Sequence, residues 1–146
     1  MDNINETIGI IFPLLPTHIQ RFFEDRKTVF VKFFVNQRSP LRLRIGSKLF
    51  FYESERNKEI VGEAKIAAIS MSTPEELLSH YKGTLFLTPN ELRQYATKRM
   101  DKKMLVITLE HLKRYSPPLR LKKSVTMAGR YMTEQMFNEL KDGSTT

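Results

Sequence analysis

Apolar residues in this chain come in short runs of strand length, separated by Gly, Pro and Thr-Pro signals. Most runs are rich in β-branched and aromatic residues, which favour strands. None approaches the ~20 consecutive apolar residues that a membrane-spanning helix requires. We therefore predict strands over residues 8–15, 29–35, 41–45, 49–52, 59–69, 104–109 and 119–125. We expect Ser116-Pro117-Pro118 to separate the last two strands, because proline cannot donate to a strand ladder.

Four threonines stand where a helix would begin: Thr17, Thr73, Thr88 and Thr133. Two of them are followed by Pro and, at the third position, by Glu, which is the pattern of a capping box with Pro in the first turn. Thr17 has Gln20 at the same spacing. We predict a short helix after each threonine, the second ending before Gly83 and the third reaching about residue 99.

Short strands with a few short helices between them indicate an α+β fold with β-barrel character. A chain of 146 residues, 40% of them hydrophobic, is long enough to bury one core and too short for two full domains. We predict a single domain over residues 1–141 and a frayed tail over residues 142–146.

Basic residues are concentrated in two acid-free segments of the chain. Residues 26–52 hold seven Lys or Arg and residues 111–133 hold six more, while the rest of the chain holds 11 basic and 16 acidic residues. If the two segments meet in space, they form one positive face of the kind that binds a phosphate backbone. The alternative is two solvated faces that point in different directions and serve solubility.

Several classes of site are absent from the sequence. With no Cys, the chain has no disulfide, thiolate metal site or cysteine nucleophile. The three His are isolated, and the six Gly form no phosphate-binding loop, so we expect neither a metal nor another cofactor. Asp2 and Glu6 stand where a signal peptide would carry basic residues, which favours a cytoplasmic protein without membrane contact.

The order of elements over roughly residues 8–109 resembles the ASCH branch of the PUA-like superfamily. The similarity lies in residues 26–32, 46–53 and 60–66, the last resembling the strand with which these domains complete a small pseudobarrel. ASCH domains carry Gly-x-Lys-x-x-Glu-x-Arg after their first helix, and the matching positions here are Asp25, Lys27, Phe30 and Lys32. The chain most resembles an uncharacterised, largely archaeal ASCH-like group.

The resemblance implies a small β-pseudobarrel with short flanking helices and a cleft beside it that binds RNA or modified bases. Some ASCH members resemble amidohydrolases of acylated cytidine, which use a lysine, a hydroxyl three residues later and a glutamate. Here Phe30 stands three residues after Lys27, and it cannot act as a nucleophile. This departure weakens the hydrolase interpretation.

The principal hypothesis is a module that binds RNA or a nucleotide in a basic cleft, with a possible place in RNA modification or translation. Cations would contact phosphate and a Tyr would stack on a base. The predicted binding residues are Lys27, Lys32, Arg42, Arg44, Tyr52, Lys65, Lys122, Arg130 and Tyr131.

The alternative is a small metal-independent hydrolase acting on a modified nucleoside or on RNA, with Lys27, Glu63 and Tyr52 in the cleft. Glu63 would then activate water as a general base. Glu63 and Lys65 lie two residues apart on one predicted strand and share a face, so a surface ion pair explains them equally well. A third class, a protein-interaction adaptor, would need an exposed apolar patch.

Overall fold

The computed structural model describes residues 6–33, 43–55, 58–81, 83–122, 125–127 and 129–143. Its six strands form one mixed sheet in the order β2-β5-β4-β3-β1-β6. Only β1 and β3 pair in parallel among the described strands; the other pairs are antiparallel. The strands are β1 (Thr7–Leu14), β2 (Val29–Lys32), β3 (Lys48–Glu53), β4 (Glu59–Ser72), β5 (Met104–Arg120) and β6 (Arg130–Thr133).

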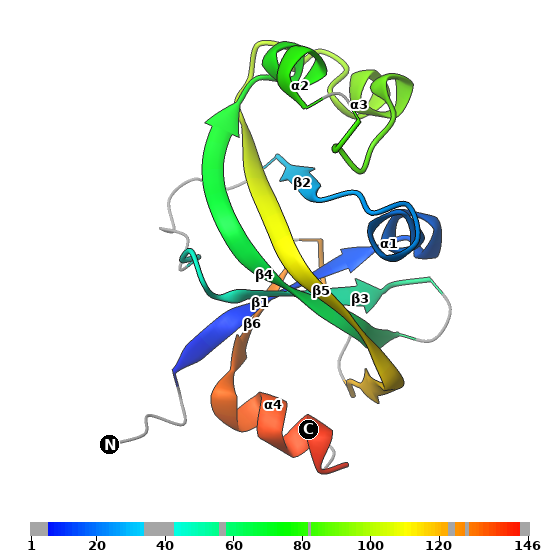
Figure 1. Ribbon diagram of the computed structural model, residues 1–146, viewed down its shortest axis with the longest axis vertical. Coiled ribbons are helices and arrows are strands. Elements are labelled where there is room, and N and C mark those ends of the chain that lie inside the picture. The colour runs from blue at the N-terminus through cyan, green and yellow to red at the C-terminus, as the bar shows by residue number, and fades with distance from the viewer. Residues whose placement is uncertain are drawn as a thin grey trace.

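The two long strands β4 and β5 run side by side and curve together across the molecule (Figure 1). Their register shifts at three places, and such bulges bend a strand and increase its twist. The expected pseudobarrel is therefore a strongly curved sheet that does not close, since β2 and β6 are its two edges among the described strands. The predicted α+β class is confirmed.

The sheet carries apolar side chains on both faces. On one face, Leu49 and Phe51 of β3 join the larger core cluster, which also contains residues of helices α1 (Pro16–Phe23), α2 (Pro74–His80) and α3 (Pro89–Tyr95). On the other face, Phe50 and Tyr52 join a smaller cluster with helix α4 (Glu134–Lys141). In Figure 1, α2 and α3 lie at one end of β4 and β5, and α4 lies at the opposite end of the molecule.

The helices begin at their predicted threonines in three of four cases. Both side-chain hydrogen bonds of the capping box form at Thr73 and at Thr88, and Thr133 accepts a hydrogen bond from the Met136 amide at the start of α4. The capping box predicted at Thr17 is wrong: the N-cap is Leu15, two residues earlier, and α1 starts at Pro16. Proline fixes φ there without needing a side-chain cap.

Helix α3 ends at Tyr95, four residues before the predicted end, and the chain turns at residues 96–98. Lys98 has φ 64°, a left-handed conformation that no α-helix continues through.

Two predicted strands differ from the structure. Residues 43–45 form no strand, because the turn from Arg44 to Ser47 uses their backbone groups: the Ser47 amide and hydroxyl both donate to the Arg44 carbonyl. Residues 41 and 42 lie outside the described part of the chain. The second difference is that β5 continues through Pro117 and Pro118 to Arg120, whereas we predicted a break. These prolines lie at a register shift, where a missing N–H donor is tolerated.

Candidate functional site

A cleft opens between α1, the end of β1, β2 and α3, and its cavity has a volume of about 480 Å³. Its lining is predominantly apolar and includes the rings of Phe30 and Phe86. Polar groups come from four places: His18 on α1, Lys32 at the end of β2, Ser54 directly after β3, and the residues of α3. The α3 side chains in the lining are Glu91, Gln94 and Tyr95.

Lys32 is the one buried charged residue in the described part of the chain, with 9% of its surface exposed. It ends the buried strand β2, and its Nζ lies 5.6 Å from the centroid of the Phe12 ring. No described carboxylate lies within ion-pair distance of this amine. Burial therefore lowers the pKa of Lys32, because water no longer solvates the charged form. An anionic or carbonyl oxygen in the cleft would give the amine the acceptor that it lacks.

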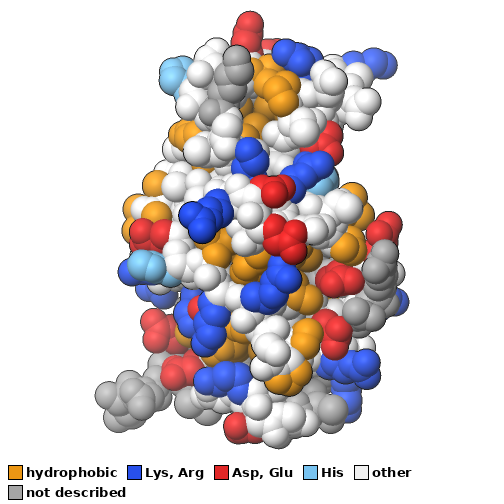
Figure 2. All heavy atoms as spheres, turned by 45° about the vertical axis from the view of Figure 1, so that its right-hand side comes forward, with side chains coloured by type: hydrophobic (Ala, Val, Ile, Leu, Met, Phe, Trp, Pro, Cys, Tyr) orange, Lys and Arg blue, Asp and Glu red, His pale blue; other side chains and the backbone are white. Residues whose placement is uncertain are grey.

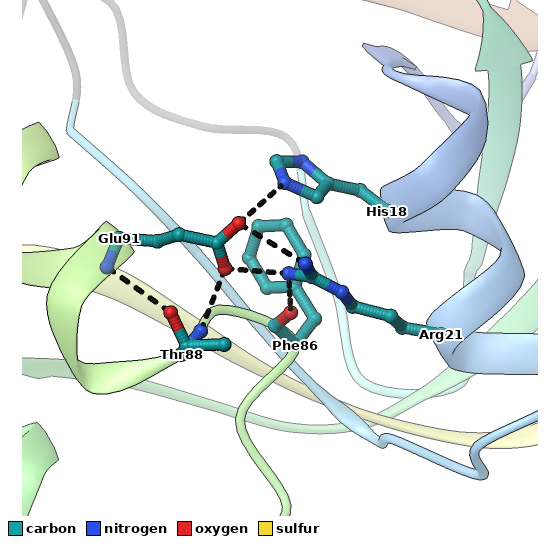
Figure 3. Close-up of polar contacts among 5 residues, drawn as sticks. All are labelled: His18, Arg21, Phe86, Thr88 and Glu91. Atoms are coloured by element: carbon teal, nitrogen blue, oxygen red, sulfur yellow. Dashed lines mark hydrogen bonds and ion pairs between the residues drawn. The ribbon is translucent and has the colours of Figure 1, made fainter.

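A charged cluster fixes α3 against α1 at one wall of the cleft (Figure 3). Arg21 donates from Nη1 to Glu91 Oε1 at 2.6 Å and from Nη2 to Oε2 at 3.0 Å, and Nη1 also donates to the Phe86 carbonyl at 3.0 Å. His18 Nε2 lies 3.6 Å from Glu91 Oε2. A bidentate pair of this kind fixes orientation as well as distance, so it holds α3 in a defined orientation relative to α1.

The same cluster sets the protonation states at this wall. The Arg21 hydrogen bonds lower the pKa of Glu91 to about 2, and the Thr88 amide contributes by donating to the carboxylate. Burial and the nearby Arg21 charge lower the pKa of His18 below its usual value of 6.5. At neutral pH the wall therefore presents a neutral imidazole beside a compensated ion pair. Lys32 is left as the cation available to a ligand within the described lining.

Comparison with known proteins places the chain in a family. The family model described as "Domain of unknown function (DUF365)" matches residues 7–134. The chain belongs to the DUF365 family. An uncharacterised protein of Methanocaldococcus jannaschii is 27% identical over 103 residues, which cover 64% of this chain and 95% of that protein.

Solved structures similar to this DUF365 protein show its fold. The crystal structure of an ASCH protein from Zymomonas mobilis is 18% identical and superimposes with a TM-score of 0.78 over 94% of this chain and 96% of that one. A single-residue variant of the same protein is 19% identical and gives a TM-score of 0.79 over 95% and 98% of the two chains. The ASCH resemblance read from the sequence is confirmed at the level of the fold.

The two acid-free segments of this DUF365 protein meet at the cleft, but Lys32 is the only one of their described cations that lines it. Residues 30–32 and Met127, one stretch from each segment, line the same cavity. Elsewhere the strand β4 introduces acids between the segments: Glu63 pairs with Lys48 at 2.9 Å and Glu59 with Arg120 at 3.4 Å. On the face that Figure 2 presents, Lys and Arg side chains alternate with Asp and Glu. The single basic face is not confirmed.

Two of the predicted binding residues, Lys27 and Lys32, line cavities. Lys32 is in the cleft, whereas Lys27 lines a neighbouring cavity, where its Nζ donates to the Gly83 carbonyl at 2.8 Å. Tyr131 is half-buried on β6 and packs against the larger core cluster.

The remaining predicted cations lie outside the cleft lining. Arg44 is exposed in a turn and lies 3.5 Å from Glu6, and Lys65 is exposed on β4 with Glu110 at 4.0 Å. Lys122 and Arg130 are exposed. Arg42 lies outside the described residues.

The three residues of the hydrolase alternative do not share a site. Tyr52 is 2% exposed within the smaller core cluster, so its ring has no face available to a base and its hydroxyl does not reach a cleft. Glu63 accepts a hydrogen bond from the Tyr115 hydroxyl at 2.6 Å and pairs with Lys48, whose Nζ lies over a ring of α4. Lys27 belongs to the cavity beside α2 and α3, at the other core cluster.

The predicted set of binding residues does not include His18, Gln94 and Tyr95, which line the cleft. The Tyr95 hydroxyl accepts a hydrogen bond from the Phe33 amide at 3.1 Å, and the two rings lie 5.2 Å apart. These partners are 62 residues apart in the sequence, so no local pattern marks them.

The described residues hold no group of three or more His, Cys, Asp or Glu that could bind a metal ion. Within the same ranges, no helix is long and apolar enough to cross a membrane.

Proposed function

We propose that the cleft binds one nucleotide unit, either of RNA or of a free nucleotide. The observation that carries this proposal is the buried, uncompensated amine of Lys32 in the lining of an otherwise apolar cleft. A desolvated ammonium group without a carboxylate is unfavourable in the free protein. A ligand that brings an acceptor oxygen to it gains a charge-assisted hydrogen bond.

The size and lining of the cleft support a base as the buried part of the ligand. A volume of about 480 Å³ lies in the ordinary range of small-molecule sites. Proteins that recognise unpaired bases place them against aromatic rings. Phe30 and Phe86 are 3% and 4% exposed and stack on Phe12, Phe22 and each other, so they form an apolar wall and not a stacking platform. The ring centroids of Phe30 and Phe86 lie 5.3 Å apart in a stacked arrangement, which makes this part of the lining rigid. Tyr95, which is 36% exposed, is the aromatic side chain of the described lining that a base can contact.

Lys32 supplies donors only, so it selects for an acceptor. A phosphate oxygen would meet this requirement, and so would guanine O6 and N7 or the carbonyl groups of uracil. We do not expect the Arg21–Glu91 pair to bind such a ligand, because Arg21 already donates two hydrogen bonds to the Glu91 carboxylate. The chemistry of the cleft thus favours ligands rich in acceptors.

Binding rather than hydrolysis is the function that this geometry supports. Lys27 lines a cavity at a different core cluster from Tyr52 and Glu63, and Tyr52 is buried. A general base must lie within hydrogen-bond reach of the proton that it removes. Binding of a nucleotide by Lys32 and the aromatic lining requires no catalytic group.

The test is calorimetric titration of the four nucleoside 5′-monophosphates and of short RNA into the wild type and into Lys32→Met. We expect the wild type to bind at least one of them and the variant to bind it at least about tenfold more weakly, the effect of one hydrogen bond to a charged group. Lys102→Met is the matched control, because Lys102 is an exposed lysine outside the cleft lining. Urea denaturation should show that Lys32→Met is at least as stable as the wild type, since it replaces a buried charge by an apolar chain. Equal binding by Lys32→Met and the wild type, or no binding of any of these probes, would refute the proposal.

A further inference from the structure

A second cavity, of about 470 Å³, lies between α1, α2 and the start of α3. Three cations from three separate places line it: Arg21 on α1, Lys27 between α1 and β2, and Arg93 on α3. Asp25 is the only acid in its described lining, and Tyr81 adds an aromatic ring. The cavity is thus positively charged, whereas Lys32 is the single Lys or Arg in the described lining of the cleft.

The cations of this cavity have donors to spare. Among the described contacts, the Lys27 ammonium group uses one of its three N–H donors, on the Gly83 carbonyl. Arg93 makes one long hydrogen bond, from Nη1 to Asn90 Oδ1 at 3.4 Å. The turn at Gly83 leaves open space, since a Cβ built there would meet no atom within 4 Å. Open space beside Gly83 thus lies next to the carbonyl that the Lys27 ammonium group contacts.

The second cavity adjoins the cleft. Phe86 and Leu87 line both of them. The pair between Arg21 and Glu91, at 2.6 Å, joins a residue of the second cavity to a residue of the cleft. The two cavities therefore share one wall, and a ligand longer than one nucleotide could contact both.

We propose that the second cavity binds the phosphodiester that flanks the nucleotide in the cleft, so that the ligand is a strand of RNA and not a free nucleotide. This inference rests on the proposed function of the cleft. Lys27 and Arg93 contact the phosphate, whereas Arg21 remains paired with Glu91. Contacts of this kind set affinity and register along a strand without reading its sequence.

The test compares uridine 5′-monophosphate with the trinucleotide UpUpU, and each other base with its own trinucleotide, by calorimetric titration at low salt. We expect the wild type to bind the trinucleotide at least about tenfold more tightly, and this advantage to fall as salt rises, because phosphate contacts release counterions. The double variant Lys27→Gln/Arg93→Gln should lose the advantage and bind the mononucleotide within about twofold of the wild type.

The control is Lys102→Gln/Lys113→Gln, which removes the same charge from two exposed lysines outside both cavity linings and should keep the trinucleotide advantage. A wild type that binds the trinucleotide no more tightly than the mononucleotide overturns the inference and leaves the proposed function standing. An equal loss in the two double variants also overturns it, because general charge would then explain the effect. If neither probe binds, the proposed function fails and the inference fails with it.

Discussion

The ion pair between Arg21 and Glu91 gives a prediction about stability that can be worked from the structure. Replacing Glu91 by Gln keeps the shape of the side chain and removes its charge. The bidentate hydrogen bonds from Arg21 then lose their charged acceptor, as does the contact from His18. The Arg21 side chain is only 25% exposed, so water compensates its charge only in part. We therefore expect Glu91→Gln to destabilise the packing of α3 on α1.

The size of the effect follows from the pKa of Glu91. The fold lowers this pKa from 4.5 to about 2, which corresponds to roughly 3 kcal/mol of differential stability. A third of the side chain is exposed, and water screens the pair, so we expect about half of that value, ~1.5 kcal/mol, at neutral pH. Because the folded pKa is depressed, this contribution is present above pH 4.5 and is lost as the pH falls towards about 2.

The assay is urea denaturation followed by circular dichroism at about pH 7 and about pH 3, since the chain has no Trp to report by fluorescence. The wild type should exceed Glu91→Gln by ~1.5 kcal/mol at the higher pH and by clearly less at the lower one. Glu110→Gln is the control: Glu110 is 44% exposed and lies 4.0 Å from Lys65, so its loss should cost under ~0.5 kcal/mol. A difference that is absent at neutral pH, or that does not shrink in acid, would refute this account of Glu91.

Two further predictions concern the packing of the sheet. Gly62→Ala should lower the free energy of unfolding in urea by ~1–3 kcal/mol, and a stability equal to the wild type would contradict this. The added Cβ would lie 2.5 Å from the Phe23 ring and 2.6 Å from the Lys113 carbonyl oxygen, and this backbone atom cannot move aside. Tyr115→Phe should lower the free energy of unfolding by ~1–2 kcal/mol, because it removes the hydroxyl that donates to Glu63 at 2.6 Å. An unchanged unfolding midpoint would show that this hydrogen bond does not stabilise the protein.

The sequence by itself determined where most elements begin. A capping box involves residues three apart, so the starts of α2 and α3 could be read from the chain at Thr73 and Thr88. The strands followed from runs of apolar and β-branched residues, which favour extended structure whatever they pack against. These local signals, in their order along the chain, also carried the resemblance to the ASCH fold, which the structural comparison confirms.

The tertiary structure alone decided which side chains meet in the cleft. Arg21 and Glu91 are 70 residues apart, and no local pattern couples them. Tyr52 was predicted in the site, but β3 is buried on both faces, so strand alternation places its ring in the second core cluster instead of at a surface. Lys32 was predicted from its charge, yet its importance comes from desolvation, which depends on the elements that pack around it. Charge and propensity are properties of the sequence, whereas burial and pairing exist only once distant segments are packed together.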